Sequence, residues 1–193
     1  MKYLSILSFM LLCTPGWSQQ WAKQYDYVDD WYCGLCIVEK DGKHGFVDKE
    51  GNLVVPLIYQ EEMHFNEGMA AVMKDGKWGF LDSTGKLVIP LQYSEVYTFT
   101  NGLGLVMKND KYGFIDPSGK AVIPLIFDNA SSFSEGLAVV SKNGMWGFID
   151  THGKEVIPMK YSYAVSFNEG YAKTKRNGKW LLIDKNGKES PAE

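Results

Sequence analysis

The sequence of 193 residues is long enough for one ordinary domain or one short array of repeats. Its composition, 45% hydrophobic and 22% charged, is typical of a folded soluble protein and excludes a disordered chain. The formal net charge is −3 and no basic stripe is visible, which argues against nucleic acid as a partner.

The first eighteen residues predict a signal peptide that is cleaved before Gln19. Lys2 precedes an apolar run over residues 4–12, and Gly16 and Ser18 are the small residues that cleavage requires. The run is too short to span a bilayer. Removal of Lys2 with this segment gives a mature charge of −4. We therefore expect an exported protein, periplasmic or extracellular.

Cys13 raises the alternative of a lipoprotein. The residue before it is Leu12, whereas a small residue is expected before a lipidated cysteine. We expect no lipidation, and no other segment is apolar enough to cross a membrane.

After a short segment, residues 19–24, the sequence repeats with a period of 34 residues and no insertion. The predicted units are about 25–58, 59–92, 93–126, 127–160 and 161–193, with no linker between them. The positions that share this spacing include Phe46, Phe80, Phe114, Phe148 and Leu182; Asp48, Asp82, Asp116, Asp150 and Asp184; and Phe65, Phe99, Phe133 and Phe167.

Each unit is predicted to form three short strands, and the fourth unit illustrates the pattern. An apolar stretch at 137–140 ends at the Asn-Gly pair 143–144, which suits a two-residue type I′ turn. A second strand at 146–149 ends at an Asp-to-Gly turn, 150–153, and a third at 155–157 ends at a proline. Glycine and proline recur too often for helices of ten residues. The fold class is therefore all-β.

One such unit is too small to fold alone, so the units must pack against one another and the end units should differ. We interpret Gly45, Gly79, Gly113 and Gly147 as places where another backbone or ring approaches closely, and Leu181 as the equivalent position with no following unit. This favours an open, solenoid-like array of antiparallel three-stranded units. The alternative is a closed, propeller-like ring.

The recurring K-x-G-K-W-G-F-I-D-x-x-G-K-x-V-I-P, followed by Y-x(5)-F-x-E-G, resembles the bacterial WG-repeat family over roughly residues 25–192. The signature pair stands at Trp78-Gly79 and Trp146-Gly147, and it departs to His44-Gly45, Tyr112-Gly113 and Trp180-Leu181. The resemblance implies a β-repeat protein, often exported, with no shared catalytic residues.

The first residue of that pair defines what we call the aromatic row: His44, Trp78, Tyr112, Trp146 and Trp180. Side chains one repeat apart could stack on sugar rings or peptide side chains, which makes them the candidate ligand-binding residues. The alternative is that they fill the core between units, because alternation places Trp78 on the same strand face as Phe80. A buried Trp146 should cost about 3–5 kcal/mol when replaced by alanine.

Two recurring acidic positions have a structural interpretation. Each Asp-x-x-Gly turn carries a single Asp and otherwise variable residues. One Asp supplies too few oxygens for calcium, so we expect it to cap its own turn. The Glu of Phe-x-Glu-Gly, at 65–68, 133–136 and 167–170, is expected to bind backbone amides at the turn. The alternative is an acidic edge for a basic partner.

Cys33 and Cys36 form a C-x-x-C motif. No second pair completes a zinc site, and no helix start lies nearby to activate a thiolate, so a redox role is disfavoured. Cys36 occupies a small, buried position of the repeat. After export these two cysteines either form a local disulfide or remain free.

No catalytic constellation is evident. His44, His64 and His152 stand at three different places in their repeats, and no nucleophile has a base partner. We expect the acidic pairs at 29–30 and 61–62 to be solvent-exposed charges in loops. The remaining alternative is a pair of glycosidase carboxylates that the fold brings together. We expect no enzyme, no cofactor and no bound metal.

These features together predict a non-catalytic module of the cell envelope that binds a protein or peptide or acts as a scaffold. The alternatives are carbohydrate or cell-wall binding through exposed aromatic rings, and a secreted structural or host-facing protein without activity.

Overall fold

The computed structural model describes residues 20–192, which form five four-stranded antiparallel sheets and one 3-10 helix, η1 (Gln20–Gln24). The predicted signal peptide, residues 1–18, and its cleavage site lie outside the described residues.

The sheets follow one another along the chain, and each one uses four consecutive strands. The strands are β1 (Tyr27–Tyr32), β2 (Leu35–Lys40), β3 (Lys43–Asp48) and β4 (Leu53–Tyr59); β5 (Glu61–Glu62), β6 (Met69–Lys74), β7 (Lys77–Asp82) and β8 (Leu87–Tyr93); β9 (Glu95–Val96), β10 (Gly104–Lys108), β11 (Lys111–Ile115) and β12 (Ala121–Phe127); β13 (Asn129–Ala130), β14 (Ala138–Lys142), β15 (Met145–Ile149) and β16 (Glu155–Tyr161); and β17 (Tyr163–Ala164), β18 (Tyr171–Arg176), β19 (Lys179–Asp184) and β20 (Glu189–Pro191).

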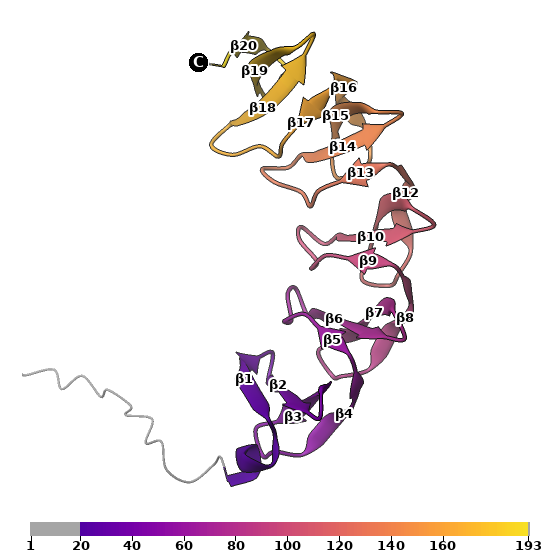
Figure 1. Cartoon of the computed structure of the whole chain (residues 1–193), viewed down its shortest axis with the longest axis vertical. Helices are drawn as coiled ribbons and strands as arrows, with labels where there is room; N and C mark the ends of the chain where they lie inside the picture. Colours follow the sequence, from indigo (N-terminus) through magenta and orange to yellow (C-terminus); the bar gives the residue numbers. More distant parts are fainter. Residues whose placement is uncertain (1–19, 193) are drawn as a thin grey trace, which may run out of the picture.

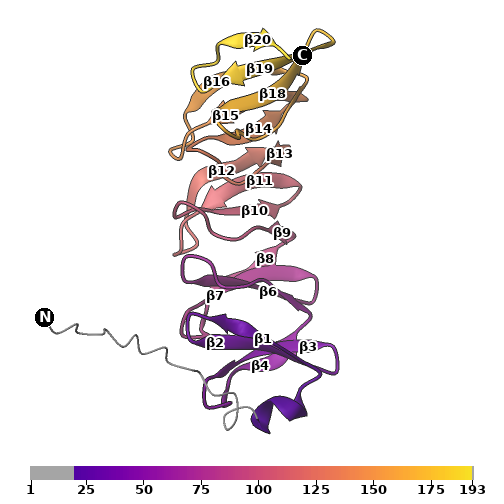
Figure 2. The ribbon, with the colours of Figure 1, turned by 90° about the vertical axis from the view of Figure 1, so that its left-hand side faces the viewer.

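The sheets stack face to face into a curved array, shown as an arc in Figure 1 and as a ladder of sheets from the side in Figure 2. The first and last sheets lie at opposite ends of the arc and do not meet (Figure 1). The all-β class and the open array are therefore confirmed. The long strands β4, β8 and β12 run along the convex side of the arc, and the turns that precede β6 and β10 project to its concave side (Figure 1).

The number of strands per unit differs from the expectation of three. Each sheet has a fourth strand, and in the four later sheets it is only two residues long, immediately after the last strand of the preceding sheet. Two residues carry no readable alternation of polar and apolar side chains, which is why the sequence did not reveal these strands. The acidic pairs 29–30 and 61–62 accordingly lie in β1 and β5 and not in loops.

The second and third strands of a sheet are joined by two-residue turns with both residues in the left-handed region. In the fourth sheet, Asn143 has φ 53° and Gly144 has φ 73°, as a type I′ turn requires. The turn before the second strand has the same form, with Glu135 at 52° and Gly136 at 87°. Asn and Asp adopt the left-handed conformation at a lower free-energy cost than other non-glycine residues, and they occupy most of the turns between the second and third strands.

The glycine of the signature pair lies beneath the last strand of its own sheet. A Cβ atom on Gly147 would stand 2.6 Å from the carbonyl oxygen of Ile157, and one on Gly79 would stand 2.4 Å from that of Ile89. The pairing between the third and fourth strands is bulged at this point in the first four sheets. In the last sheet, Leu181 pairs directly with Pro191 without a bulge. The close approach of another backbone predicted for these glycines is thus confirmed, but that backbone belongs to the glycine's own sheet. The interpretation of Leu181 as a position that lacks a following unit was therefore wrong, because Leu181 is accommodated by the unbulged pairing of its own sheet.

The cores lie between neighbouring sheets. The phenylalanine of the third strand meets a phenylalanine from the next repeat, as in Phe80 and Phe99, whose ring centroids are 5.0 Å apart, or Phe148 and Phe167 at 4.8 Å. All four of these rings are buried. The outer face of the first sheet is covered by η1, since Trp21 packs against the cluster around Cys36. Inter-sheet packing and this cap therefore stabilise units that could not fold alone.

The Asp of each Asp-x-x-Gly turn caps the turn, as expected. The Oδ1 atom of Asp150 accepts hydrogen bonds from the backbone N–H groups of His152 and Lys154, both at 2.9 Å. Asp48, Asp82, Asp116 and Asp184 accept the equivalent pair of bonds. These bonds hold the pKa of the Asp150 carboxyl below its ordinary value.

Candidate functional site

The aromatic row occupies the same position on the third strand of every sheet, and in the first four sheets its face is covered by the next sheet. Its five members differ in exposure. Trp78 is a core residue with 8% of its surface exposed, His44, Tyr112 and Trp146 are half-buried, and Trp180 is 41% exposed. The sequence thus predicted five equivalent candidates, and the structure separates one of them from the rest.

The buried and half-buried members have partners inside the array. Trp78 belongs to the core between the second and third sheets. Tyr112 donates its hydroxyl hydrogen to Oε2 of Glu95 at 2.5 Å, and burial together with this bond raises the pKa of the phenol. For these positions the structural alternative, packing between units, is the one that the geometry supports.

The position of His44 makes the first junction polar. Its Nδ1 atom lies 2.5 Å from Oε2 of Glu62, at an angle outside hydrogen-bond geometry, so the contact is an ion pair when the imidazole is protonated. Burial raises the pKa of the Glu62 carboxyl. His64 lies 3.3 Å from Asp29 and stacks on Tyr32, with ring centroids 4.6 Å apart. Both contacts join the first sheet to the second, which is a structural role.

Trp146 and Trp180 are linked through Tyr163. The centroid of Tyr163 lies 5.8 Å from that of Trp146 and 5.9 Å from that of Trp180, the latter with an interplanar angle of 84°. Such edge-to-face contacts are a favourable arrangement for aromatic rings. Because Tyr163 is itself 44% exposed, the two rings of Tyr163 and Trp180 form a continuous aromatic surface at the end of the array.

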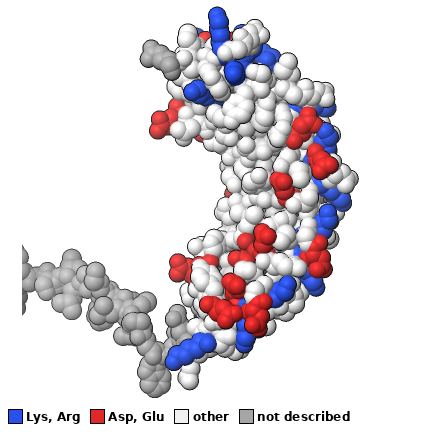
Figure 3. Space-filling model, in the orientation of Figure 1, with Lys and Arg blue, Asp and Glu red and all other residues white. Residues whose placement is uncertain are grey.

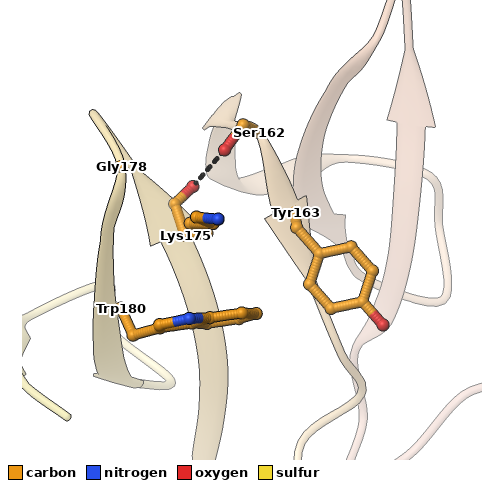
Figure 4. Close-up of a pocket in the computed structure, with 5 residues that line it drawn as sticks. All are labelled: Ser162, Tyr163, Lys175, Gly178 and Trp180. Carbon is orange, nitrogen blue, oxygen red and sulfur yellow. Dashed lines mark hydrogen bonds between the residues drawn. The ribbon is translucent and has the colours of Figure 1, made fainter.

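An open pocket of about 520 Å³ lies at this surface, lined by Ser162, Tyr163, Lys175, Gly178 and Trp180 (Figure 4). The side chain of Lys175 extends over the ring of Trp180, and Tyr163 closes the opposite side (Figure 4). The Ser162 hydroxyl donates to the carbonyl oxygen of Lys175 at 3.1 Å, which ties β18 to the segment before β17. Gly178 belongs to the turn between β18 and β19.

The pocket opens on what we call the outward face, the face of the last sheet directed away from the fourth. The residues of this face are Tyr171, Lys173, Lys175, Trp180 and Leu182. Tyr171 is 55% exposed and Lys173 is exposed, although the equivalent positions in the preceding sheet, Leu137 and Val139, are 7% and 1% exposed. Among the described residues, no further sheet covers this face.

The edge of the last sheet is held by Glu189. This carboxylate lies between Lys160 at 3.0 Å and Arg176 at 2.6 Å, and it accepts a 2.9 Å hydrogen bond from the Tyr161 hydroxyl. Although burial acts to raise it, the bonds from Lys160 and Tyr161 lower the pKa of Glu189. Burial, together with this bond, raises the pKa of Tyr161 to about 12. The short strand β20 is therefore held to β16 of the fourth sheet and to β18 of its own sheet.

The Glu of Phe-x-Glu-Gly binds backbone amides, as expected, but those of the next repeat. Glu67 accepts bonds from the N–H groups of Asn101 and Gly102 at 2.9 and 2.8 Å, and Glu135 accepts from Gly170 at 3.1 Å. Lys185 also pairs with Glu135. These bonds join turns on the concave side of the arc. They connect neighbouring units and leave little of either carboxylate for a basic partner.

The cysteines lie where the repeat positions suggested. Cys36 is fully buried and its thiol donates to the carbonyl oxygen of Asp29 at 3.0 Å, whereas Cys33 is exposed in a turn with φ 53°. Both are free thiols in the structure. Burial raises the pKa of the Cys36 thiol, which makes it a poor nucleophile. The disulfide stays a prediction.

The residues that surround Trp180 were not predicted from the sequence: Ser162, Tyr163, Lys173, Lys175 and Gly178. A usable signal was present at Lys173, which stands where earlier repeats have Ile37, Ala71, Leu105 and Val139. Within residues 20–192, no group of three or more His, Cys, Asp or Glu side chains is placed to hold a metal ion. No helix in the same range is long and apolar enough to cross a membrane.

Solved structures with a similar fold share little sequence with this chain. Hsv2 of Kluyveromyces marxianus matches with a TM-score of 0.52 at 12% identity, over 81% of this chain and 57% of that one. Hsv2 of Kluyveromyces lactis gives 0.51 at 10% identity, over 84% and 63%. A eukaryotic initiation factor gives 0.53 at 9% identity, over 86% and 56%. The chain thus spans less than two thirds of the length of each of these proteins. The similarity is to β-propeller-like folds, and at this level of identity it concerns the fold and not the function.

No match was found among curated protein sequences. The model of a repeat family described as "WG containing repeat" matches five consecutive segments, residues 22–43, 45–78, 78–112, 112–146 and 146–180. These segments cover most of the chain and follow the repeat seen in the sheets. The chain therefore belongs to the WG containing repeat family.

Proposed function

We propose that this chain is an exported, non-catalytic module that binds a protein or peptide partner in the cell envelope, with the outward face as its contact surface. The observation that carries the proposal is the contrast within the aromatic row. Four members are occluded by a following sheet, whereas Trp180 is 41% exposed and lines a pocket. Exposed aromatic rings beside a pocket are the kind of anchor that dominates binding energies at interfaces.

Two further features support this proposal. The array is rigidly stacked, with a core at every junction, so that the outward face is presented by a preformed scaffold. The signal-peptide pattern of residues 1–18 supports export to the envelope or beyond. A module of this kind would act by holding its partner and not by converting it.

Binding of a carbohydrate is the second candidate. Sugar rings stack on exposed aromatic side chains, and the ring of Trp180 with its neighbour Tyr163 offers such a platform. Under this alternative one or two rings carry most of the affinity and soluble sugar competes. Under the first proposal the contact extends over the outward face, and sugar has no effect.

The test is a pull-down with the mature chain, Gln19 to Glu193, against solubilised envelope proteins and cell-wall glycan in parallel. Trp180→Ala is compared with Tyr97→Ala, which removes an aromatic ring of similar exposure, 44% against 41%, from the third repeat. We expect capture of a defined protein, unaffected by sugar, that is lost in Trp180→Ala and retained in Tyr97→Ala.

Three results would contradict the proposal in different ways. Retention on glycan that sugar releases would establish the second candidate. Capture that survives Trp180→Ala would place the contact surface elsewhere. Failure of both arms would favour a structural or host-facing role.

A further inference from the structure

The outward face differs from the other sheet faces in charge as well as exposure. We propose that its ligand is acidic: a segment of a partner protein that carries carboxylates next to an apolar side chain. This inference rests on the proposed function, because it names the chemistry of the partner at the same site.

Two ammonium groups stand over the exposed tryptophan. The Nζ atoms of Lys173 and Lys175 lie 4.9 and 5.4 Å from the centroid of the Trp180 ring. At these distances the quadrupole of the ring attracts a cation and holds it beside the pocket. An ammonium group has three donors, which the ring does not use, so each lysine can still bind a carboxylate.

In the part of the chain that the structure describes, the two lysines over Trp180 are unpaired, whereas three other cations near the last sheet each have a carboxylate partner. Lys160 and Arg176 share Glu189, and Lys185 pairs with Glu135. Within residues 20–192, neither Lys173 nor Lys175 has a carboxylate oxygen within 4.0 Å. Two unpaired cations beside an aromatic pocket are the arrangement that an acidic ligand would complete.

The charge along the array points in the same direction. The last unit, residues 161–193, has six basic and four acidic residues, whereas residues 25–92 have six basic and twelve acidic. Figure 3 shows lysine and arginine side chains gathered at the end of the arc formed by the last sheet, with acidic side chains more numerous at the opposite end. An acidic segment would thus be attracted to the outward face and repelled from the first two sheets.

The chemistry of the pocket favours a peptide over a sugar. Sugar hydroxyls need acceptors as well as donors, and the hydroxyl groups of Ser162 and Tyr163 are the only side-chain acceptors in the lining. The remaining lining is ring surface, a lysine and a glycine. An apolar side chain in the pocket with carboxylates on Lys173 and Lys175 uses each of these features.

A second copy of this chain, with its acidic end, is disfavoured as the occupant. The outer face of the first sheet is covered by η1, with Trp21 packed against Tyr25 and Trp31 at centroid distances of 6.2 and 6.1 Å. Stacking one array on the next would require this cap to move. The acidic segment is therefore assigned to a different protein.

The experiment measures binding of the labelled mature chain to three immobilised pools of random decapeptides, which differ only in carrying glutamate, glutamine or lysine at fixed positions. Lys173→Glu/Lys175→Glu is compared with Lys142→Glu/Lys154→Glu, which makes the same change in net charge on exposed lysines of the fourth repeat. Trp180→Ala, a milder Lys173→Gln/Lys175→Gln variant and circular dichroism spectra of every protein complete the set.

We expect the glutamate pool to retain at least about tenfold more chain than the glutamine pool at low salt, with the difference shrinking at high salt because exposed charges are screened. The Lys173→Glu/Lys175→Glu variant should lose this preference, the glutamine variant should lose most of it, and the Lys142→Glu/Lys154→Glu control should keep it. All variants should retain the wild-type spectrum, since the substituted side chains are not in a core.

The outcomes separate this inference from the proposed function. Binding that depends on Trp180 but not on the glutamates or the two lysines would overturn the inference and leave the function standing. Binding independent of Trp180 and of the lysines would overturn both. Stronger binding of the chain to immobilised polygalacturonate than to any peptide pool would assign the face to an anionic glycan and overturn the inference. Self-association that rises with protein concentration and is lost in the Lys173→Glu/Lys175→Glu variant would assign the face to a second copy and would also overturn it. Equal retention on all pools would also overturn it.

Discussion

The fourth and the last sheets are built from the same repeat, yet their equivalent faces differ in what covers them. On the fourth sheet, Val139 and Phe148 are buried under the last sheet. On the last sheet the equivalent positions are Lys173 and Leu182, and no further sheet covers them within the described residues. The same backbone position is thus a core residue inside the array and a surface residue at its end.

The difference shows how a repeat array can acquire a binding surface. A side chain such as that of Trp146 serves packing as long as a following unit covers it. In the last sheet the same position, occupied by Trp180, is not covered by a following sheet within the described residues. Lys173 and Lys175 stand beside it where the fourth sheet has the buried Val139 and Ser141. The predictions below compare the two sheets, from the largest expected effect to the smallest.

Removal of the packing phenylalanine should have the largest effect. Phe148→Ala should reduce the free energy of unfolding by about 3–5 kcal/mol, because the ring is fully buried against Phe167. Leu182→Ala, at the equivalent half-buried position, should cost about 1 kcal/mol. Urea denaturation monitored by circular dichroism measures both. Equal losses would mean that the last sheet is covered as the fourth one is.

The signature glycine should be intolerant of a side chain only inside the array. Gly147→Ala would place a Cβ atom 2.6 Å from the carbonyl oxygen of Ile157, and we expect a loss of about 1–3 kcal/mol as the bulge adjusts. Leu181→Ala keeps a Cβ atom that the last sheet already accommodates, so its effect is confined to lost packing. Thermal melts of the two variants give the comparison, and a neutral Gly147→Ala would refute the close approach.

The two tryptophans at the end of the row should separate stability from binding. Trp146→Ala should cost about 2–3 kcal/mol, since the ring is half-buried and packs on the core between the last two sheets. Trp180→Ala should cost less than about 1 kcal/mol because its ring is largely solvated. Chemical denaturation of both variants at one protein concentration provides the test; a larger loss for Trp180→Ala would show that its ring is structural.

The hydrogen bonds from a glutamate to the backbone amides of the next turn should slow hydrogen exchange only where a next turn exists. Glu67→Gln should accelerate hydrogen exchange at the amides of Asn101 and Gly102 several-fold, with little change in global stability. The matched control is Glu169→Gln, since no described turn follows it. Exchange measured by NMR distinguishes the two, and unchanged rates at Asn101 and Gly102 would show that the carboxylate does not protect them.

The smallest expected effect is the loss of stability at acidic pH, which should be similar in all repeats. Hydrogen bonds within the turn hold the pKa values of Asp82 and Asp116 below their ordinary value of 3.8. A depressed pKa in the folded state contributes stability that is fully present above the unfolded value and is lost as the pH falls through the folded value. We therefore expect stability to decline below about pH 4. Asp116→Asn should weaken this decline, and denaturation midpoints between pH 2 and pH 6 measure it.

Much of the architecture could be predicted from the sequence, because spacing carries it. Phe80 and Phe114 differ by one period, and the turns at Asn143-Gly144 and Asp150 have strong local preferences. The two-residue strands such as β9 could not be predicted, since their pairing is decided by the neighbouring strand and not by their own residues. The open array was predicted in part from Leu181, but the close approach at this position comes from the same sheet and does not report on a following unit.

The candidate site was predicted only in part. The aromatic row was the predicted site, but its members occupy equivalent positions in the sequence and differ in which residues cover them in the structure. Tyr163 stands one repeat after Asn129 and two repeats after Glu95, so its aromatic contact with Trp180 has no periodic signal. The lysines over the Trp180 ring come from the neighbouring strand, and that proximity depends on register.

The central claim is that, within the aromatic row, Trp180 is free to bind while the other members are structural. Hydroxyl-radical footprinting of the intact chain, read by mass spectrometry with and without the captured partner, tests it most directly. We predict rapid oxidation of Trp180 and Tyr163 and slow oxidation of Trp78 in the free chain, with protection of Trp180 and Tyr163 on binding. Oxidation of Trp78 as fast as that of Trp180, or protection confined to other repeats, would contradict the account.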